Sequence, residues 1–106
     1  MLLLTKALRK KLPKLYSQEE VDDPQVICKF FTPDSSWTWY ALEFDGDDTF
    51  FGYVAGHFPE LGYFRLSELT QVRGQLNLPV ERDRGFKPTP LSEIKKLEEK
   101  NRGGGW

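Results

Sequence analysis

Two tryptophans separated by a single residue, Trp37 and Trp39, have a type and spacing that suit binding. Alternate side chains of a β-strand point to the same face, so both indoles are expected on one face of a strand. Two neighbouring indoles form either an interface for a partner or a platform on which nucleic-acid bases stack.

Two arginines, Arg82 and Arg84, alternate with acids in the run ERDR. Such alternation is typical of local ion pairs across a loop. It is also compatible with an arginine pair that binds phosphate or carboxylate. The predicted binding surface therefore consists of Trp37, Trp39, Arg82 and Arg84.

The chain offers little for catalysis or metal binding. His57 is the single histidine, and the single cysteine, Cys28, alternates with Val26 and Phe30, which predicts a small buried side chain. The acids of residues 45–48 are too closely spaced for a calcium loop, which needs about six oxygens from a longer segment. We expect no catalytic residue, no metal and no cofactor, and therefore no enzyme.

The composition predicts one globular domain. With 106 residues, 39% of them hydrophobic and 14% aromatic, the chain supports a single core. A pI near 5.8 argues against a basic surface over the whole domain. One cysteine and no visible signal peptide or membrane segment predict a cytoplasmic protein. We expect a domain over residues 1–100 and a flexible, glycine-rich tail over 101–106.

The hydrophobic pattern predicts an α+β fold. Thr5 is a suitable N-cap for a short helix that ends before Pro13, and Thr89 and Pro90 would open a final helix. A short helical turn is expected at 67–72. β-Branched and aromatic runs predict four strands, at residues 25–32, 36–44, 49–58 and 62–66. We expect these to form one antiparallel sheet of about four strands, with the two helices on one face.

Alternation along the second strand divides its side chains between the faces. Tyr40, Leu42 and Phe44 form the more uniformly apolar set and are assigned to the core, which turns Glu43 to the face of the tryptophans. A two-residue turn at 46–47 gives the pairs Tyr40 with Tyr53, Leu42 with Phe51, Trp39 with Val54 and Trp37 with Gly56. A three-residue turn shifts this register by one.

Two short helices would cover only one face of such a sheet. The tryptophan face would then remain open to a partner, although the indoles could instead cover weak glycine positions in the neighbouring strand. A protein partner is the leading expectation. Single-stranded nucleic acid or a nucleotide is the alternative, a homodimer is compatible with the pattern, and no membrane partner is expected.

Four stretches of the chain carry a family resemblance: LTKALRKKLPKLY, FFTPDSSWTWYALEFDGDDTFFGYVAG, ELGYFRLSEL and RGQLNLPVERDRGFKPTPLSEI. Together they resemble an uncharacterised bacterial family, domain of unknown function 2958, over residues 3–95. The resemblance implies a small protein of plasmids, integrative elements and phages. The expected function is binding a host macromolecule to counter restriction or CRISPR-type defence. The resemblance supplies no catalytic or ligand-binding residues.

Overall fold

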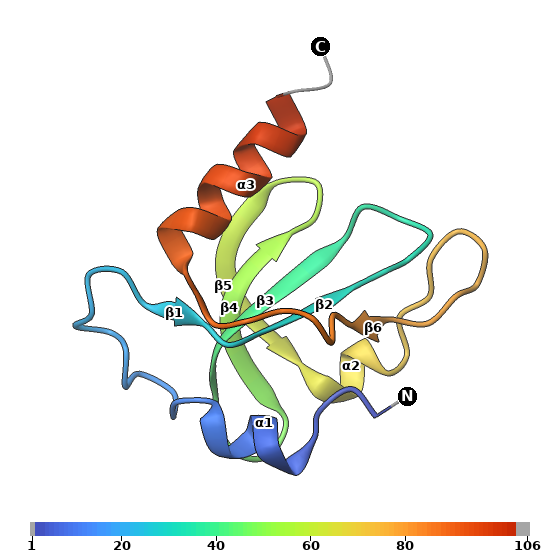
Figure 1. Cartoon of the computed structure of the whole chain (residues 1–106). Helices are drawn as coiled ribbons and strands as arrows, with labels where there is room; N and C mark the ends of the chain where they lie inside the picture. Colours follow the sequence, from blue (N-terminus) through green and yellow to red (C-terminus); the bar gives the residue numbers. More distant parts are fainter. Residues whose placement is uncertain (1, 104–106) are drawn as a thin grey trace.

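The computed structural model describes residues 2–103, in which three helices surround a five-stranded sheet and a two-stranded sheet (Figure 1). The α+β class, the antiparallel sheet and the helices near both ends are as predicted. In chain order the elements are α1 (Lys6–Lys11), β1 (Gln25–Val26), β2 (Cys28–Phe31), β3 (Thr38–Phe44), β4 (Thr49–Ala55), β5 (Pro59–Arg65), α2 (Leu66–Leu69), β6 (Glu81–Arg82), β7 (Thr89–Pro90) and α3 (Leu91–Gly103).

The larger sheet has the order β5-β4-β3-β2-β6, and all its neighbouring strands are antiparallel. The predicted strand over residues 25–32 is divided at Ile27, because β1 pairs with β7 whereas β2 pairs with β3 and β6. The two-residue strand β6 lies in a segment for which the sequence predicts no regular element. The two-residue strand β7 occupies Thr89–Pro90, where the final helix was predicted to open, so α3 begins at Leu91 instead. Pairing with distant partners, rather than local propensity, makes them strands.

Carboxylates from elsewhere in the chain cap two of the helices. Asp48 accepts hydrogen bonds from the backbone N–H and the hydroxyl of Ser67 at the start of α2. Asp23 does the same for Ser92 at the start of α3, and these bonds lower the pKa of its carboxyl group. α1 instead has the predicted local cap, since the Thr5 hydroxyl accepts a hydrogen bond from the backbone N–H of Leu8.

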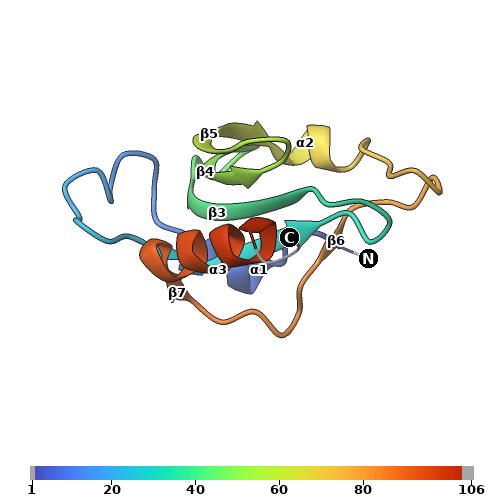
Figure 2. The same ribbon diagram turned by 90° about the horizontal axis from the view of Figure 1, so that it is seen from above.

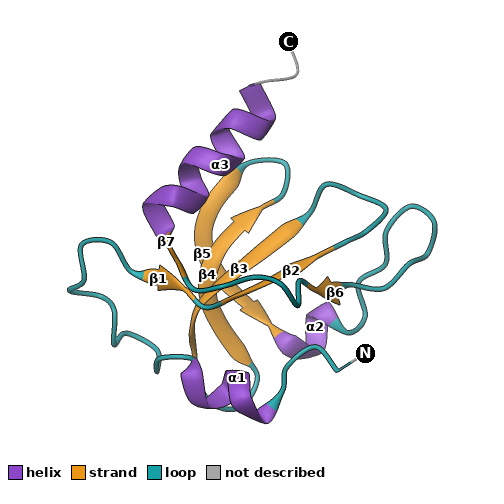
Figure 3. Cartoon of the chain, viewed as in Figure 1, coloured by secondary structure: helices purple, strands orange, loops and turns teal. Residues whose placement is uncertain are grey.

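The two longer helices lie on opposite faces of the large sheet, which corrects the prediction that they share one face. In Figure 1, α3 lies beside the upper ends of the strands and α1 lies near their lower ends, and Figure 3 shows the helices in the same view. Leu4, Leu8 and Leu12 pack with the cluster on the Trp39 face, whereas Leu91 and Ile94 of α3 pack with the cluster on the opposite face. The chain covers both faces because the leucine stripe and α3 each have an apolar surface of their own.

A β-bulge in β3 explains why the predicted division of side chains between the faces is partly wrong. The pairs Tyr40–Tyr53 and Trp39–Val54 form as expected, but the register shifts between Ala41 and Glu43. Leu42 therefore does not pair with Phe51; Glu43 does. Beyond the bulge Phe44 joins the cluster of Trp39, and Glu43 lies on the α3 face.

The segment over residues 13–18 covers the part of β3 that β2 leaves unpaired. Phe44 donates a backbone hydrogen bond to the Pro13 carbonyl oxygen, at 2.9 Å. The Gln18 side-chain amide donates to the Leu42 carbonyl oxygen, also at 2.9 Å. The bulged backbone therefore has partners outside the sheet, and an exposed strand edge is avoided.

The two long loops project from opposite ends of the molecule. Figure 2 shows the loop between α1 and β1 on the left and the loop between α2 and β6 on the right. At the C-terminus, α3 continues through Gly103, three residues into the expected tail, and residues 104–106 lie outside the described part. None of the helices within residues 2–103 has both the length and the apolar character needed to cross a membrane.

Two glycines that face each other across β4 and β5 offer a direct test of how closely the sheet is packed. Gly52 and Gly62 are cross-strand partners, yet a β-carbon at Gly52 would lie 2.0 Å from the Tyr40 carbonyl oxygen, whereas one at Gly62 would meet nothing within 4 Å. We expect Gly52→Ala to lower the free energy of unfolding by about 1–3 kcal/mol or more. Gly62→Ala should change it by less than about 1 kcal/mol. Denaturant unfolding followed by tryptophan fluorescence measures both, and equal stability of the two variants would contradict the structure.

Candidate functional site

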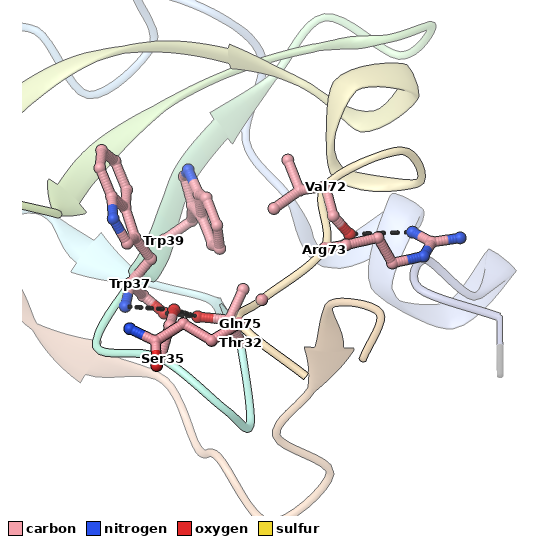
Figure 4. A pocket seen from close by; sticks show the side chains of 8 residues that line it. Thr32, Ser35, Trp37, Trp39, Val72, Arg73 and Gln75 are labelled. Carbon is pink, nitrogen blue, oxygen red and sulfur yellow. Dashed lines mark hydrogen bonds between the residues drawn. The ribbon is translucent and has the colours of Figure 1, made fainter. Parts of the chain in front are cut away.

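The two tryptophans of the predicted binding surface form one wall of an open pocket of about 530 Å³ (Figure 4). Trp39 is in β3, and Trp37 precedes it in the β2–β3 loop. Their rings are stacked, with centroids 5.9 Å apart and planes inclined by 29°. Thr32 and Ser35, whose hydroxyl groups are hydrogen-bonded to each other, form the polar edge of this wall.

The opposite wall comes from the loop that follows α2. Val72 faces the indoles across the pocket, whereas the guanidinium group of Arg73 points away from them (Figure 4). Arg73 donates to the carbonyl oxygens of Thr70 and Val72, at 3.1 and 2.8 Å. The interior of the pocket is therefore largely apolar, and its polar groups lie at the rim.

Asp34 fixes the two walls relative to each other. Its Oδ2 accepts hydrogen bonds from the backbone N–H groups of Leu76 and Leu78, at 2.5 and 3.3 Å. Its Oδ1 is buried against Gly74, where an added β-carbon would lie only 1.5 Å away. The absence of a side chain at Gly74 thus lets the β2–β3 loop contact the loop after α2.

Neither indole presents an open face of the kind that the sequence predicts. Trp39 is only 7% exposed and belongs to a buried cluster. Trp37 is half-buried: its ring meets the edge of His57 at 81°, and a β-carbon at Gly56 would lie 2.4 Å from two carbons of its six-membered ring. Trp37 therefore covers Gly56, as the alternative interpretation of the sequence predicts, and the pair contributes a wall rather than a platform.

The predicted arginines lie in a different pocket from the tryptophans. Arg82 donates hydrogen bonds to the carbonyl oxygens of Leu2 and Leu3, at 2.6 and 2.9 Å, and so holds the N-terminal segment against β6. Arg84 is exposed, and both arginines line a depression of about 460 Å³ beside Lys11. The structure therefore does not bring the four predicted residues together.

Three exposed apolar side chains, in the loop after α2 and in the β4–β5 turn, were not among the binding residues predicted from the sequence. Phe58, next to His57 in the β4–β5 turn, is 81% exposed; Leu76 is 76% exposed, and Leu78 is also exposed. The two leucines belong to the loop whose start forms the far wall of the pocket. Apolar residues next to Gly74 and Pro59, residue types typical of turns, are a sequence signal for exposed apolar side chains on loops. The sequence alone does not show where these two loops lie relative to the tryptophans.

The cysteine and the histidine that were considered for catalysis do not form a catalytic arrangement. Cys28 is buried, and loss of solvation raises the pKa of its thiol to about 12, although Arg82 acts in the opposite direction. The thiol is therefore protonated at neutral pH. His57 is exposed and in contact with Trp37. Within residues 2–103 no group of three histidine, cysteine or acidic residues is arranged to hold a metal ion.

Fold and pocket together define a small α+β protein with an apolar, tryptophan-lined cavity between two loops. The chain belongs to the family described as Protein of unknown function (DUF2958), whose model matches residues 3–103. The match confirms the family resemblance and extends it through α3. No curated protein and no solved structure matches the chain.

Proposed function

We propose that this chain is a non-enzymatic interaction protein of a mobile genetic element and binds a host protein through the tryptophan pocket. The observation that carries the proposal is this apolar pocket together with three exposed side chains near it in the chain. Leu76 and Leu78 belong to the loop that supplies Gln75 to the lining, and Phe58 follows His57, which contacts Trp37. Exposed aromatic and leucine side chains on loop tips are costly in water and are typical of interaction surfaces.

The lining of the pocket specifies the chemistry of the occupant. Trp37, Trp39 and Val72 provide apolar walls, while Thr32 and Gln75 provide polar groups near the rim. An aromatic or leucine side chain would fill the apolar part, and the flanking backbone of the partner would meet the polar rim. This combination of a desolvated anchor and a polar rim is the common design of protein interfaces.

Binding of single-stranded nucleic acid receives less support from the geometry. Base stacking needs an open aromatic face, whereas Trp39 is buried and Trp37 packs on Trp39 and Gly56. Phosphate groups would need cations that face the indoles, but the Arg73 guanidinium in the pocket wall points away from them and binds backbone carbonyl groups. Arg82 lies in another pocket, where it also binds backbone carbonyl groups. Nucleic acid therefore remains the alternative.

The family resemblance supports the proposed setting. It points to plasmids, integrative elements and phages, in which a small binding protein can block a restriction or CRISPR-type enzyme by occupying one of its surfaces. Such a role needs a stable fold and an adhesive patch, and it needs no chemistry at the site. The buried thiol of Cys28 and the separated arginines are compatible with that requirement.

Peptide selection tests the chemistry of the pocket. A random peptide library displayed on phage should yield binders with a shared phenylalanine, tryptophan or leucine. We expect Val72→Lys, which places a charge in the apolar wall, to weaken these binders at least about tenfold. The control, Leu97→Lys, alters an exposed leucine on α3 and should leave affinity unchanged. Binders that respond equally to both substitutions, or that are displaced by single-stranded DNA, would contradict the proposal.

Conjugation assays test whether the chain protects a mobile element from host defence. An element from which this chain has been deleted should transfer less efficiently into a recipient with an active restriction or CRISPR-type system, and normally into a recipient without one. The wild-type chain should restore transfer, whereas an equally abundant Val72→Lys chain should not. Equal transfer with and without the chain into defended recipients would count against a counter-defence role.

A further inference from the structure

A second cavity lies on the opposite face of the sheet, where the bulge of β3 directs Glu43. Glu43 pairs with Phe51 of β4, and Phe51 pairs with Tyr63 of β5, so the three side chains form one row across the sheet. The rings of Phe51 and Tyr63 are in contact, with centroids 5.1 Å apart. Regular alternation without the bulge would turn Glu43 to the Trp39 face and leave this row without its carboxylate.

The loop between α1 and β1 forms a wall over this row. Both oxygens of Glu43 accept backbone hydrogen bonds, from Tyr16 at 2.8 Å and from Gln18 at 2.7 Å. Tyr16 adopts a left-handed backbone conformation, with φ of 71°, which is uncommon for a tyrosine. Its side chain and that of Tyr63 both line the cavity.

The cavity is small and has a mixed lining. Its volume is about 140 Å³, close to the roughly 150 Å³ of an engineered cavity that holds benzene, so it accommodates a group of only a few heavy atoms. Aromatic rings and carboxylates make up much of the wall. The full lining is Tyr16, Gln18, Glu19, Pro24, Leu42, Glu43, Phe51 and Tyr63.

The charged side chains that line the cavity are all acidic. Glu43 is only 4% exposed, and no lysine or arginine among the described side chains forms an ion pair with it. Glu19 adds a second carboxylate at the mouth. The neighbouring Tyr16 side chain raises the pKa of Tyr63, and the charges of Glu43 and Glu19 act in the same direction. Tyr63 thus experiences a negative electrostatic potential.

We propose that this cavity is a binding site for an alkylammonium group, held between the rings of Tyr16, Phe51 and Tyr63 and the carboxylates of Glu43 and Glu19. Aromatic faces and carboxylates both attract organic cations, and desolvation strengthens both interactions. The cation comes either from a free small molecule of the choline type or from a lysine side chain of a protein. The site lies at the opposite end of the sheet from the tryptophan pocket and is independent of the function proposed there.

Amide NMR titrations test the site with defined probes at constant ionic strength. Choline should produce saturable shifts centred on Tyr16, Phe51 and Tyr63. The neutral alcohol in which carbon replaces the ammonium nitrogen has the same shape and should bind at least about fivefold more weakly. A parallel titration with a capped lysine amide identifies the source: tighter binding than choline indicates a protein side chain, and weaker binding indicates a small molecule.

Two variants complete the experiment. Tyr63→Leu removes a ring that is 57% exposed, so the fold should persist, and affinity for choline should fall at least about fivefold. Phe58→Leu makes the same kind of change at the other end of the molecule and should leave binding unaltered. No saturable shift with either cation, an equal response to the neutral alcohol, or unchanged affinity in Tyr63→Leu would overturn the proposal.

Discussion

The β-bulge at Leu42 is the constraint on which the arrangement of both faces depends. Because one extra residue is accommodated in β3, Glu43 lies on the α3 face, and Phe44 packs against Phe50 on the other. The Glu43 carboxylate then accepts hydrogen bonds from the loop between α1 and β1, while Gln18 binds the carbonyl oxygen at the bulge. A local irregularity of the sheet therefore determines the path of a distant loop.

This arrangement lets the chain cover both sides of its sheet. The segment before β1 passes from the face of α1 to the face of α3, where Asp23 caps the start of α3 through Ser92. On that face Tyr40 donates a hydrogen bond to Glu98 at 2.5 Å, and burial raises the pKa of Tyr40 well above its usual range. The helices therefore complete two cores, and the apolar surface that remains exposed concentrates on loops.

The two cavities occupy opposite ends of this scaffold and differ in chemistry. The pocket beside the loop after α2 is apolar and open, and it is bordered by exposed side chains such as Leu76. The cavity beneath the loop before β1 is smaller and combines rings with the carboxylate of Glu43. A rigid sheet that carries different loops at its two ends can present two unrelated binding sites without a change of fold.

Sequence patterns predicted what depends on local residues. β-Branched and aromatic runs located the main strands, and Thr5 marked the start of α1. The bulge was not predictable, because Leu42, Glu43 and Phe44 alternate as in a regular strand. Asp23 was likewise not recognisable as the cap of α3, because it lies far away in the sequence. For the same reason, the patterns could not show that β6 pairs with β2 and carries the arginines away from the tryptophans.

Native-state hydrogen exchange in wild type and in Glu43→Gln is the most direct test of the role of the bulge. Glutamine keeps the size of the side chain but can accept one hydrogen bond through its oxygen and presents an amide donor in place of the second acceptor. We expect the Tyr16 and Gln18 amides to lose protection in Glu43→Gln, while the paired amides of β4 and β5 keep theirs. Unchanged protection of Tyr16 and Gln18 in Glu43→Gln would show that the Glu43 carboxylate does not position this loop.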